Sequence, residues 1–420
     1  MANENNLFNN LKQRGFIYQS TNDKELEKRL NNERLTFYMG IDPTAESLHV
    51  GHLFCLRMFK LLQDAGHKGI LVIGGATAMV GDPSGKSDIR KVLDNKQVEK
   101  NISEVKKFSS KFINTKGENP AIIKNNSEWI SKMSYMDFLR NVGMHFPISQ
   151  MLASDAYAKR LESGGLTFLE LGYMPLQAYD FVHLHKNYGC DLQIGGSDQW
   201  GNIVAGTMLK RKMDYVNDEE NKREVLGLTS PLLTNKDGKK MGKTEKGALW
   251  LDQSKVSAFD FFQYFYNVDD ADVEKLMKIF TDKPVEKISQ MIKDDIILAK
   301  KEMAKEITAL VHGDKEAEKA VDVADKLFSK KDDFKNADIP AFELSSKLFD
   351  EDGLQVTELL TKANITKSKG EARRLIKQGG IYLEEKRLEN SEQKIKEADF
   401  DDGQIIIRKG KKNYTKIVKI

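Results

Sequence analysis

A run of four consecutive apolar residues, Ile70-Leu71-Val72-Ile73, constrains this chain more than any other feature of its sequence. An unbroken run of this kind is typical of a strand buried on both faces of a parallel sheet. It follows a β-rich segment over 36–41 and a helical pattern over 53–65. A strand, a helix and a strand in this order predict a right-handed crossover, and therefore an α/β fold with a doubly wound parallel sheet.

The length of 420 residues exceeds what one hydrophobic core supports, so we expect several domains. Residues 96–165 are mostly helical in pattern, which indicates an insertion between two halves of the sheet. The pattern is nearly all helical from about 256 to 330, and residues 331–350 form a polar linker region that holds Pro340. We predict an α/β domain over 1–245, an all-α domain over 246–335 and a small α+β domain over 350–420.

The charge of the chain is unevenly distributed. The whole chain carries +3, whereas the last sixty residues hold 16 Lys and Arg against 9 Asp and Glu, or +7, which leaves −4 for the rest. A basic terminal domain on a slightly acidic body indicates that a polyanion is held at one end.

The chain has only two cysteines, Cys55 and Cys190, and neither belongs to a CxxC pair. We therefore expect an intracellular, cytoplasmic protein. No Cys/His cluster has the spacing of zinc ligands, so we expect no metal ligands on the protein. No stretch approaches the roughly 18 apolar residues needed to cross a bilayer, so we expect no membrane partner.

The segment His49-Val50-Gly51-His52 lies between the first predicted strand and its helix. A doubly wound sheet binds ligands at the carboxyl ends of its strands, where a helix N-terminus carries partial positive charge. Two imidazoles at this place can donate hydrogen bonds to phosphate oxygens, and Gly51 leaves room for a base or a ribose. Two incidental histidines are the alternative, but the preceding Tyr-Met-Gly-Ile-Asp-Pro-Thr segment favours a site.

A glycine-rich segment over 74–87 lacks the spacing of a phosphate-binding P-loop, because only three residues separate Gly81 from Gly85-Lys86-Ser87. We interpret it as a loop that lets a substrate approach the backbone, with Asp82 available to a cationic group. A plain turn is the alternative.

A second loop carries Lys240-Met241-Gly242-Lys243-Thr244 and opens with Lys236-Asp237-Gly238. Mobile ammonium groups in such a loop can reach the phosphates of a nucleotide late in a reaction. A solvated lysine-rich hairpin is the alternative, and the pairing with the histidine segment argues against it.

Polar groups also share one face of the helix predicted over 174–188, where Tyr173, Gln177 and Asp180 stand at i, i+4 and i+7. A phenol, an amide and a carboxylate on one face can hold an ammonium and a hydroxyl group, although a structural polar network is possible too. The turn after the predicted strand 191–194 contains Asp198, which could bind ribose hydroxyls.

Basic residues gather in a helix near the C-terminus, which ends in a Gly-Gly turn and a strand, and again in a run over 408–412. They suit RNA phosphates, and a solvated charged helix is the alternative. The residues that we assign to RNA binding are Lys367, Lys369, Arg373, Arg374, Lys377, Arg408, Lys411 and Lys412.

Taken together, these segments resemble the bacterial-type tyrosyl-tRNA synthetases, a family of class I aminoacyl-tRNA synthetases. HVGH is similar to the HIGH signature of the class, and KMGKT is similar to its KMSKS signature. The segments YMGIDPTAESLHVGH, GDPSGK, YMPLQAYD and LQIGGSDQWGN resemble segments of the tyrosine enzymes, and the basic terminal unit resembles their alpha-L RNA-binding motif. The resemblance runs in order along nearly the whole chain.

The resemblance implies a Rossmann-type catalytic domain, a helical anticodon-binding domain and an RNA-binding domain, in a homodimer whose interface includes residues 96–165. It implies that tyrosine reacts with ATP, accompanied by Mg²⁺, and that the tyrosyl group passes to tRNA(Tyr), with no zinc and no DNA involved.

Residue roles are implied only where a position matches the motifs. Tyr38 and Asp180 would bind the phenol of tyrosine. Its ammonium group would be held by Tyr173, Gln177 and Asp82, with Gln193 and Gln199 nearby. The residues that would line ATP or the adenylate are Gly40, Asp42, Gly51, Gly196, Asp198 and Lys243. The residues that would stabilise the transition state are Thr44, His49, His52, Lys86, Arg90, Lys240, Lys243 and Thr244.

Three other functions stay open at this point. A tryptophanyl-tRNA synthetase shares the fold and the signatures, but the phenol-binding helix and the RNA-binding unit argue against it. A non-catalytic RNA-binding protein on the same fold could do without His49, His52, Lys240 and Lys243, so the presence of all four argues against this function. A nucleotidyltransferase that acts on a small acid would not need the basic terminal unit, which argues for a large RNA partner instead.

Overall fold

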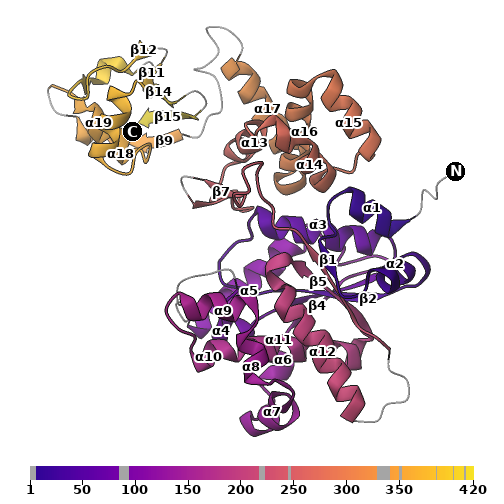
Figure 1. Cartoon of the computed structure of the whole chain (residues 1–420). Helices are drawn as coiled ribbons and strands as arrows, with labels where there is room; N and C mark the ends of the chain where they lie inside the picture. The colour runs from indigo at the N-terminus through magenta and orange to yellow at the C-terminus, as the bar shows by residue number, and fades with distance from the viewer. Residues whose placement is uncertain are drawn as a thin grey trace. The chain divides into compact units, whose positions relative to one another are not determined.

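The structure is a computed structural model that describes residues 6–84, 94–216, 223–244, 247–328, 341–349, 352–384, 386–400, 402–410 and 413–420 (Figure 1). Contacts divide the chain into two compact units. The first unit consists of Met1–Val256 with Asn267–Leu310, and the second consists of Ser257–Tyr266 with Val311–Ile420. Each unit is described by itself below.

A six-stranded sheet with the order β1-β6-β5-β2-β3-β4 forms the centre of the first unit. Its neighbours are parallel except for β1 and β6. The strands are β1 (Gln19–Ser20), β2 (Thr36–Ile41), β3 (Lys68–Ile73), β4 (Ile122–Asn125), β5 (Cys190–Gly196) and β6 (Leu226–Ser230). The direction of winding reverses between β2 and β5, and such a reversal opens a crevice at the carboxyl ends of the strands. The predicted fold class is confirmed.

The sequence accounts for the elements that flank this reversal. In β3 all residues after Lys68 are buried, as expected of a strand covered on both faces. The helix α3 (Val50–Asp64) begins at His49 as its N-cap. The long helix α11 (Tyr173–Tyr188) ends at Gly189, whose φ of 63° suits a glycine C-cap. Helices α3, α11 and α12 (Trp200–Val216) pack against the sheet.

Residues 96–165, which we predicted to be mostly helical, also supply a strand of the sheet. The strand β4 pairs in parallel with β3, so Asn125 and Asn126 reach the edge that carries the crevice. Besides α3, the helices described in the first unit up to α10 are α1 (Leu7–Gln13), α2 (Asp23–Asn32), α4 (Thr77–Val80), α5 (Asn95–Ser109), α6 (Ser127–Ile130), α7 (Tyr135–Asn141), η1 (Gly143–His145), α8 (Ile148–Leu152), α9 (Asp155–Glu162) and α10 (Phe168–Leu171).

The stretch from 258 to 328 is helical, as predicted. It follows a small hairpin of β7 (Lys243–Thr244) and β8 (Gly247–Ala248). The helices are α13 (Ala258–Tyr266), α14 (Asp270–Phe280), α15 (Val285–Asp294), α16 (Ile296–His312) and α17 (Asp314–Phe328). In the second unit α13 packs against α17.

The C-terminal part of the second unit is a small α+β fold with a five-stranded sheet in the order β12-β11-β14-β15-β9. The expected linker over 331–350 is partly wrong, because β9 (Ala341–Leu344) pairs in parallel with β15 (Asn413–Lys419). Its other elements are η4 (Ser346–Leu348), β10 (Leu354–Gln355), α18 (Val356–Lys362), α19 (Lys369–Lys377), β11 (Ile381–Leu383), β12 (Lys386–Arg387), β13 (Lys394–Ile395), η5 (Glu397–Asp399) and β14 (Gln404–Lys409).

Candidate active site

The crevice between β2 and β5 collects polar residues from segments that are far apart in the sequence. Asp42 follows β2, and Asp198 lies in η2 (Ser197–Gln199) directly after β5. Parallel strands present their carboxyl ends at one edge of the sheet, so both carboxylates flank the reversal point. Burial raises the pKa of Asp198, whereas the positive charge of Lys240 opposes that shift.

The two histidines of the HVGH segment stack on each other at the start of α3, with ring centroids 3.9 Å apart. His49 Nδ1 accepts the backbone N–H of Gly51 at 3.1 Å, and His52 Nδ1 accepts the backbone N–H of His49 at 3.2 Å. Burial, followed by the charge of Lys240, lowers the pKa of His49 to about 4. Burial also holds the pKa of His52 well below its ordinary value.

Both rings are therefore neutral at physiological pH. Since each Nδ1 accepts a hydrogen bond, the proton of each neutral ring lies on Nε2. The pair thus offers two N–H donors at a helix N-terminus, which is suited to the oxygens of an anionic ligand.

The loop over 236–244, called the lysine loop below, and the segment that follows it pack against the HVGH segment. Residues 249–251 run beside residues 48–50, with Val50 N donating to Leu249 O and Leu251 N donating to Leu48 O. Gly242 has a φ of 80°, and a Cβ at this position would lie 2.3 Å from Val50 Cγ1. This close approach brings the charge of Lys240 into reach of both histidines and of Asp198.

A buried phenol and a buried carboxyl face each other beneath the crevice. Tyr38 is fully buried against Phe181, and its hydroxyl has no hydrogen-bond partner among the described residues. Burial and then the charge of Asp180 raise the pKa of Tyr38 well above its ordinary value. Burial raises the pKa of Asp180 to about 7. An orphaned buried hydroxyl beside a carboxyl is a place where a ligand group can complete the hydrogen bonding.

Hydrogen bonds hold the Asp180 carboxyl in place. Trp129 Nε1 donates to Oδ1 at 2.7 Å, and Asn126 Nδ2 donates to Oδ2 at 3.1 Å. Both bonds favour the ionised form and oppose the effect of burial on the pKa of Asp180. The orientation of this carboxyl is therefore set by residues at the end of β4 and in α6.

The same network extends to the other side of the crevice. Asn126 Nδ2 also donates to Thr77 Oγ1 at 3.1 Å, and Thr77 Oγ1 donates to Asp42 Oδ1 at 2.7 Å. The Tyr173 hydroxyl donates to Asp42 Oδ2 at 2.9 Å. The sequence did not single out Asn126, Thr77 or Trp129.

A second group of polar side chains surrounds Asp82. Its Oδ2 accepts Gln199 Nε2 at 2.7 Å, and its Oδ1 accepts the backbone N–H of Ser84 at 2.8 Å. Gln199 Oε1 in turn accepts Asn202 Nδ2 at 3.2 Å. Asp82 is 6% exposed, so this chain of bonds holds a buried carboxyl group in place.

The remaining predicted residues are placed as follows. Gln193 is buried on β5 with its Oε1 unpaired among the described residues, and Gln177 is half-buried on α11. Gly40 and Thr44 are exposed at the end of β2 and in the turn that follows, Gly51 lies in the first turn of α3, and Gly196 ends β5. The structure describes Lys243 and Thr244 by their backbone alone. Outside the described residues lie Lys86, Arg90, Lys411 and Lys412.

Of the predicted RNA-binding residues that the structure describes, five lie on α19 or just before it, and Arg408 lies on β14. Ala372 and Ile376 face the core, whereas Arg373, Arg374 and Lys377 are exposed. Lys367 and Lys369 are exposed at the start of the helix, where Lys369 pairs with Glu358 at 2.7 Å. On β14 the Arg408 guanidinium lies 3.8 Å from the centre of the Tyr382 ring. Together they form a cationic surface with an aromatic ring.

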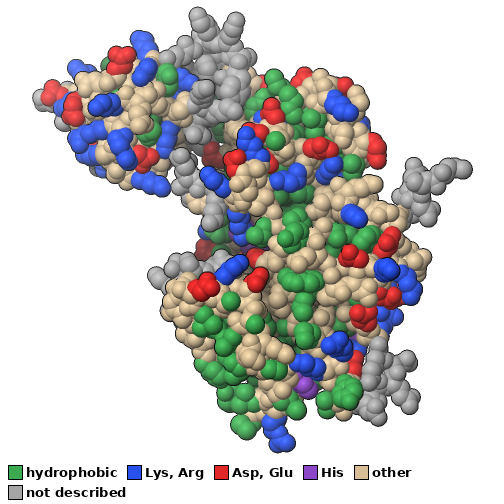
Figure 2. Space-filling model, in the orientation of Figure 1, with side chains coloured by type: hydrophobic (Ala, Val, Ile, Leu, Met, Phe, Trp, Pro, Cys, Tyr) green, Lys and Arg blue, Asp and Glu red, His purple; other side chains and the backbone are tan. Residues whose placement is uncertain are grey.

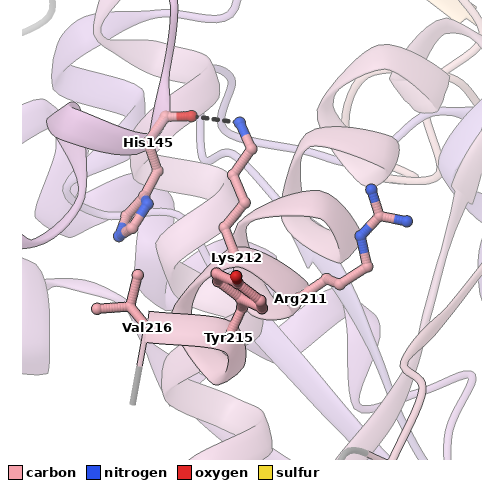
Figure 3. A pocket seen from close by; sticks show the side chains of 5 residues that line it. All are labelled: His145, Arg211, Lys212, Tyr215 and Val216. Atoms are coloured by element: carbon pink, nitrogen blue, oxygen red, sulfur yellow. Dashed lines mark hydrogen bonds between the residues drawn. The ribbon is translucent and has the colours of Figure 1, made fainter. Parts of the chain in front are cut away.

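A separate hollow of about 360 Å³ lies beside the end of α12 (Figure 3). Lys212 Nζ donates to the backbone carbonyl of His145 across it at 2.6 Å. The hollow is lined by His145, Arg211, Lys212, Tyr215 and Val216, none of which belongs to the predicted site.

Two further observations concern metals and membranes. Within the described ranges, no three His, Cys, Asp or Glu side chains gather closely enough to hold a metal ion. No helix in the part of the chain that the structure describes is long and apolar enough to cross a bilayer.

The family model for class I tRNA synthetases (W and Y) matches residues 30–329, and a model for the C-terminal domain of tyrosine–tRNA ligases of the SYY type matches residues 332–417. The chain belongs to the class I tRNA synthetase family (W and Y).

Individual relatives point to one branch of this family. Tyrosine–tRNA ligase of Clostridium kluyveri is 45% identical over 416 residues, which cover 98% of this chain and 99% of the relative. The enzyme of Caldanaerobacter subterraneus is 44% identical over 411 residues, 97% of this chain and 98% of the relative. A truncated mitochondrial tyrosyl-tRNA synthetase of Aspergillus nidulans matches in structure with a TM-score of 0.69 and 30% identity, over 78% of this chain and 95% of its own.

The raised pKa of Asp180 predicts a pH dependence of stability. A carboxyl with a pKa of about 7 when folded, against about 4 when unfolded, binds its proton more tightly in the folded state. It therefore lowers the free energy of unfolding as the pH rises from about 4 to about 7. We expect Asp180→Asn to lack this loss, so that its stability relative to the wild type rises by on the order of 2 kcal/mol between about pH 5 and about pH 8.

Urea unfolding followed by tryptophan fluorescence measures this difference, because Trp129, Trp200 and Trp250 all lie in the first unit. A difference between variant and wild type that stays constant over this range would show that Asp180 titrates normally.

Proposed function

We propose that this protein is a tyrosine–tRNA ligase. The observation that carries the proposal is the 44–45% identity to tyrosine–tRNA ligases over almost the whole chain. In the first step a carboxylate oxygen of tyrosine attacks the α-phosphorus of ATP, and the bond to the bridging oxygen of pyrophosphate breaks. In the second step a hydroxyl of the terminal tRNA ribose attacks the tyrosyl carbonyl, and AMP leaves.

The pocket around Tyr38 and Asp180 binds the side chain of tyrosine in this proposal. The phenol donates to the Asp180 carboxylate and accepts from the unpaired hydroxyl of Tyr38. A phenylalanine side chain would leave the buried Tyr38 hydroxyl unpaired and would donate no hydrogen bond to the Asp180 carboxylate, which is a strong basis for discrimination. Tyrosyl-tRNA synthetases are themselves the standard example of this rule. The substrate ammonium group meets the polar wall formed by Tyr173, Gln177 and Asp82, with Gln193 and Gln199 nearby.

The nucleotide lies over the carboxyl ends of β2 and β5 in this proposal. Asp42, Asp198 and the adjoining glycines Gly40, Gly51 and Gly196 line the adenylate and its ribose. The Nε2–H groups of His49 and His52 donate to phosphate oxygens, and Thr44 and the cations Lys240, Lys243, Lys86 and Arg90, together with Thr244, balance charge on the departing pyrophosphate. ATP enters with Mg²⁺ bound as part of the substrate. No side chain forms a covalent intermediate, so orientation and charge provide the acceleration.

The cationic face of α19 binds tRNA in this proposal. Its exposed arginines and lysines meet backbone phosphates, and Tyr382 with Arg408 offers a stacked surface to a base. We further propose the three-part division into catalytic, anticodon-binding and RNA-binding domains over 1–245, 246–335 and 350–420.

A second copy of the chain is the partner that we propose for the exposed apolar surface of the first unit. Figure 2 shows hydrophobic side chains gathered over the end of this unit that carries α7, α8 and α10 in Figure 1. A contiguous apolar surface of this kind favours an interface in a homodimer. The exposed residues are Tyr135, Met136, Leu139, Met144, Ile148, Leu161, Phe168 and Leu169. The free cysteines Cys55 and Cys190 support a cytoplasmic location.

Amino-acid-dependent exchange of pyrophosphate into ATP, measured with all twenty amino acids and without tRNA, tests the function. We expect exchange with tyrosine alone, because adenylate formation precedes the transfer to tRNA. Exchange with tryptophan would move the protein to the sister branch of the family. Folded protein that exchanges with no amino acid would refute the catalytic assignment.

The contact between the two signature segments predicts a difference between two glycine variants. Gly242→Ala places a methyl group against Val50, whereas Gly238→Ala, with a similar φ of 75°, meets nothing within 4 Å. Both carry the backbone strain of a left-handed residue, and only Gly242→Ala displaces the lysine loop from His49 and His52. We expect Gly242→Ala to reduce the maximal exchange rate about tenfold more than Gly238→Ala does, which is a difference of roughly 1.4 kcal/mol. Equal rates in the two variants would mean that the contact has no catalytic role.

Replacing Arg374 and Lys377 by alanine separates RNA binding from adenylate formation. We expect the double variant to bind tRNA more weakly, and the slope of log affinity against log salt to fall by about two, one for each phosphate that is no longer neutralised. Filter binding at several salt concentrations measures the slope, and the exchange of pyrophosphate serves as the control. An unchanged slope would place the tRNA elsewhere on the surface.

A further inference from the structure

The turn at which the lysine loop begins is held by side chains from the first two turns of α14. Asp272 Oδ2 accepts the backbone N–H of Lys236 at 3.2 Å, and Lys275 Nζ donates to the backbone carbonyl of Thr234. Asp272 and Lys275 also pair with each other at 3.4 Å. Two side chains one helical turn apart therefore hold the backbone on both sides of Asn235.

The surroundings of Asp272 stabilise its carboxylate. Asp272 is 3% exposed and stands in the first turn of α14, where the positive end of the helix dipole favours its charge. The N-cap residue Asp269 adds a third contact, because its carboxylate pairs with Lys236 Nζ at 2.7 Å. The helix itself is anchored at its other end, where Arg14 donates to the carbonyls of Lys278 and Thr281.

The fastened turn determines the position of Lys240. The backbone reverses direction after Asn235 and forms a hairpin. In this hairpin Asn235 N donates to Lys239 O, and Met241 N donates to Leu233 O. Lys240 is paired with Thr234 in a β-bridge of this hairpin. A shift of residues 234–236 would therefore be passed directly to Lys240, whose charge reaches His49, His52 and Asp198.

We propose that Asp272 and Lys275 are positioning residues for the adenylate-forming step, which act by fixing the base of the lysine loop. The inference rests on the proposed function, and it assigns a catalytic consequence to residues outside the two signature segments. The loop acts on the pyrophosphate of the transition state and not on tyrosine. Its loosening should therefore lower the rate of adenylate formation and leave tyrosine binding unchanged.

Asp270 offers a matched control. It is a neighbouring aspartate in the same helical turn, but its carboxylate pairs with Lys300 on α16 at 2.7 Å. We expect Asp272→Ala to lower the maximal rate of tyrosine-dependent pyrophosphate exchange about tenfold, with the tyrosine KM changed less than about twofold. Asp270→Ala should keep both values within about twofold of the wild type.

Lys275→Met provides a second variant in case Asp272→Ala does not fold, because Lys275 is 39% exposed and methionine keeps the length of its stem. We expect the same split, a lower rate with an unchanged KM. Amide hydrogen exchange of the peptide over 233–242 should become faster in both variants, and exchange of the α11 peptide should stay unchanged.

The outcomes are distinguishable. A wild-type protein without tyrosine-dependent exchange would overturn the proposed function and this inference with it. An active wild type beside folded Asp272→Ala or Lys275→Met variants with full exchange rates would overturn the inference alone. So would a rise in tyrosine KM that matches the fall in rate, because it would indicate general damage to the first unit.

Discussion

The parallel pairing of β2 with β5 is the constraint on which the rest of the site depends. It sets side by side the carboxyl ends of two strands that are about 150 residues apart in the sequence, and the winding of the sheet reverses between them. Asp42 leaves one of these strands and Asp198 follows the other, while α3 begins beside them with its paired histidines. The other groups of the site are arranged around the carboxyl ends of these two strands.

Burial sets the charge of the site before any substrate arrives. It keeps His49 and His52 neutral, so that each ring presents an N–H and no full positive charge to the crevice. It also raises the pKa of Asp180 to about 7, and a hydrogen bond donated by a ligand would favour the ionised carboxyl and oppose that shift. A full positive charge comes from Lys240, whose charge acts on His49, His52 and Asp198. This combination of neutral N–H donors on the histidines and a full positive charge on the loop agrees with a reaction in which negative charge accumulates on a departing group.

A single amide, Asn126, joins the two halves of the site. It donates to Asp180 on one side and to Thr77, which is bonded to Asp42, on the other, and it accepts from the backbone of Ala76 at 2.8 Å. Buried polar networks of this kind hold their members in one arrangement when all of them are paired. The anchoring of the lysine loop on α14 follows a similar plan, since buried side chains of one element fix the backbone of another.

The sequence by itself determined the fold class, the helix and strand order around the crevice and most of the polar residues in it. Apolar runs, amphipathic spacing and glycine punctuation are local signals, so the strand 36–41 and the helix α11 could be predicted nearly to the residue. Only the tertiary structure decided that 122–125 forms a strand at the edge of the sheet and that 341–344 joins the terminal sheet, because short strands depend on partners distant in the chain. For the same reason the sequence did not disclose Asn126, Trp129, Thr77 or Asp272. Each lies in an ordinary local pattern, and its importance comes from a partner that folding brings within hydrogen-bonding distance.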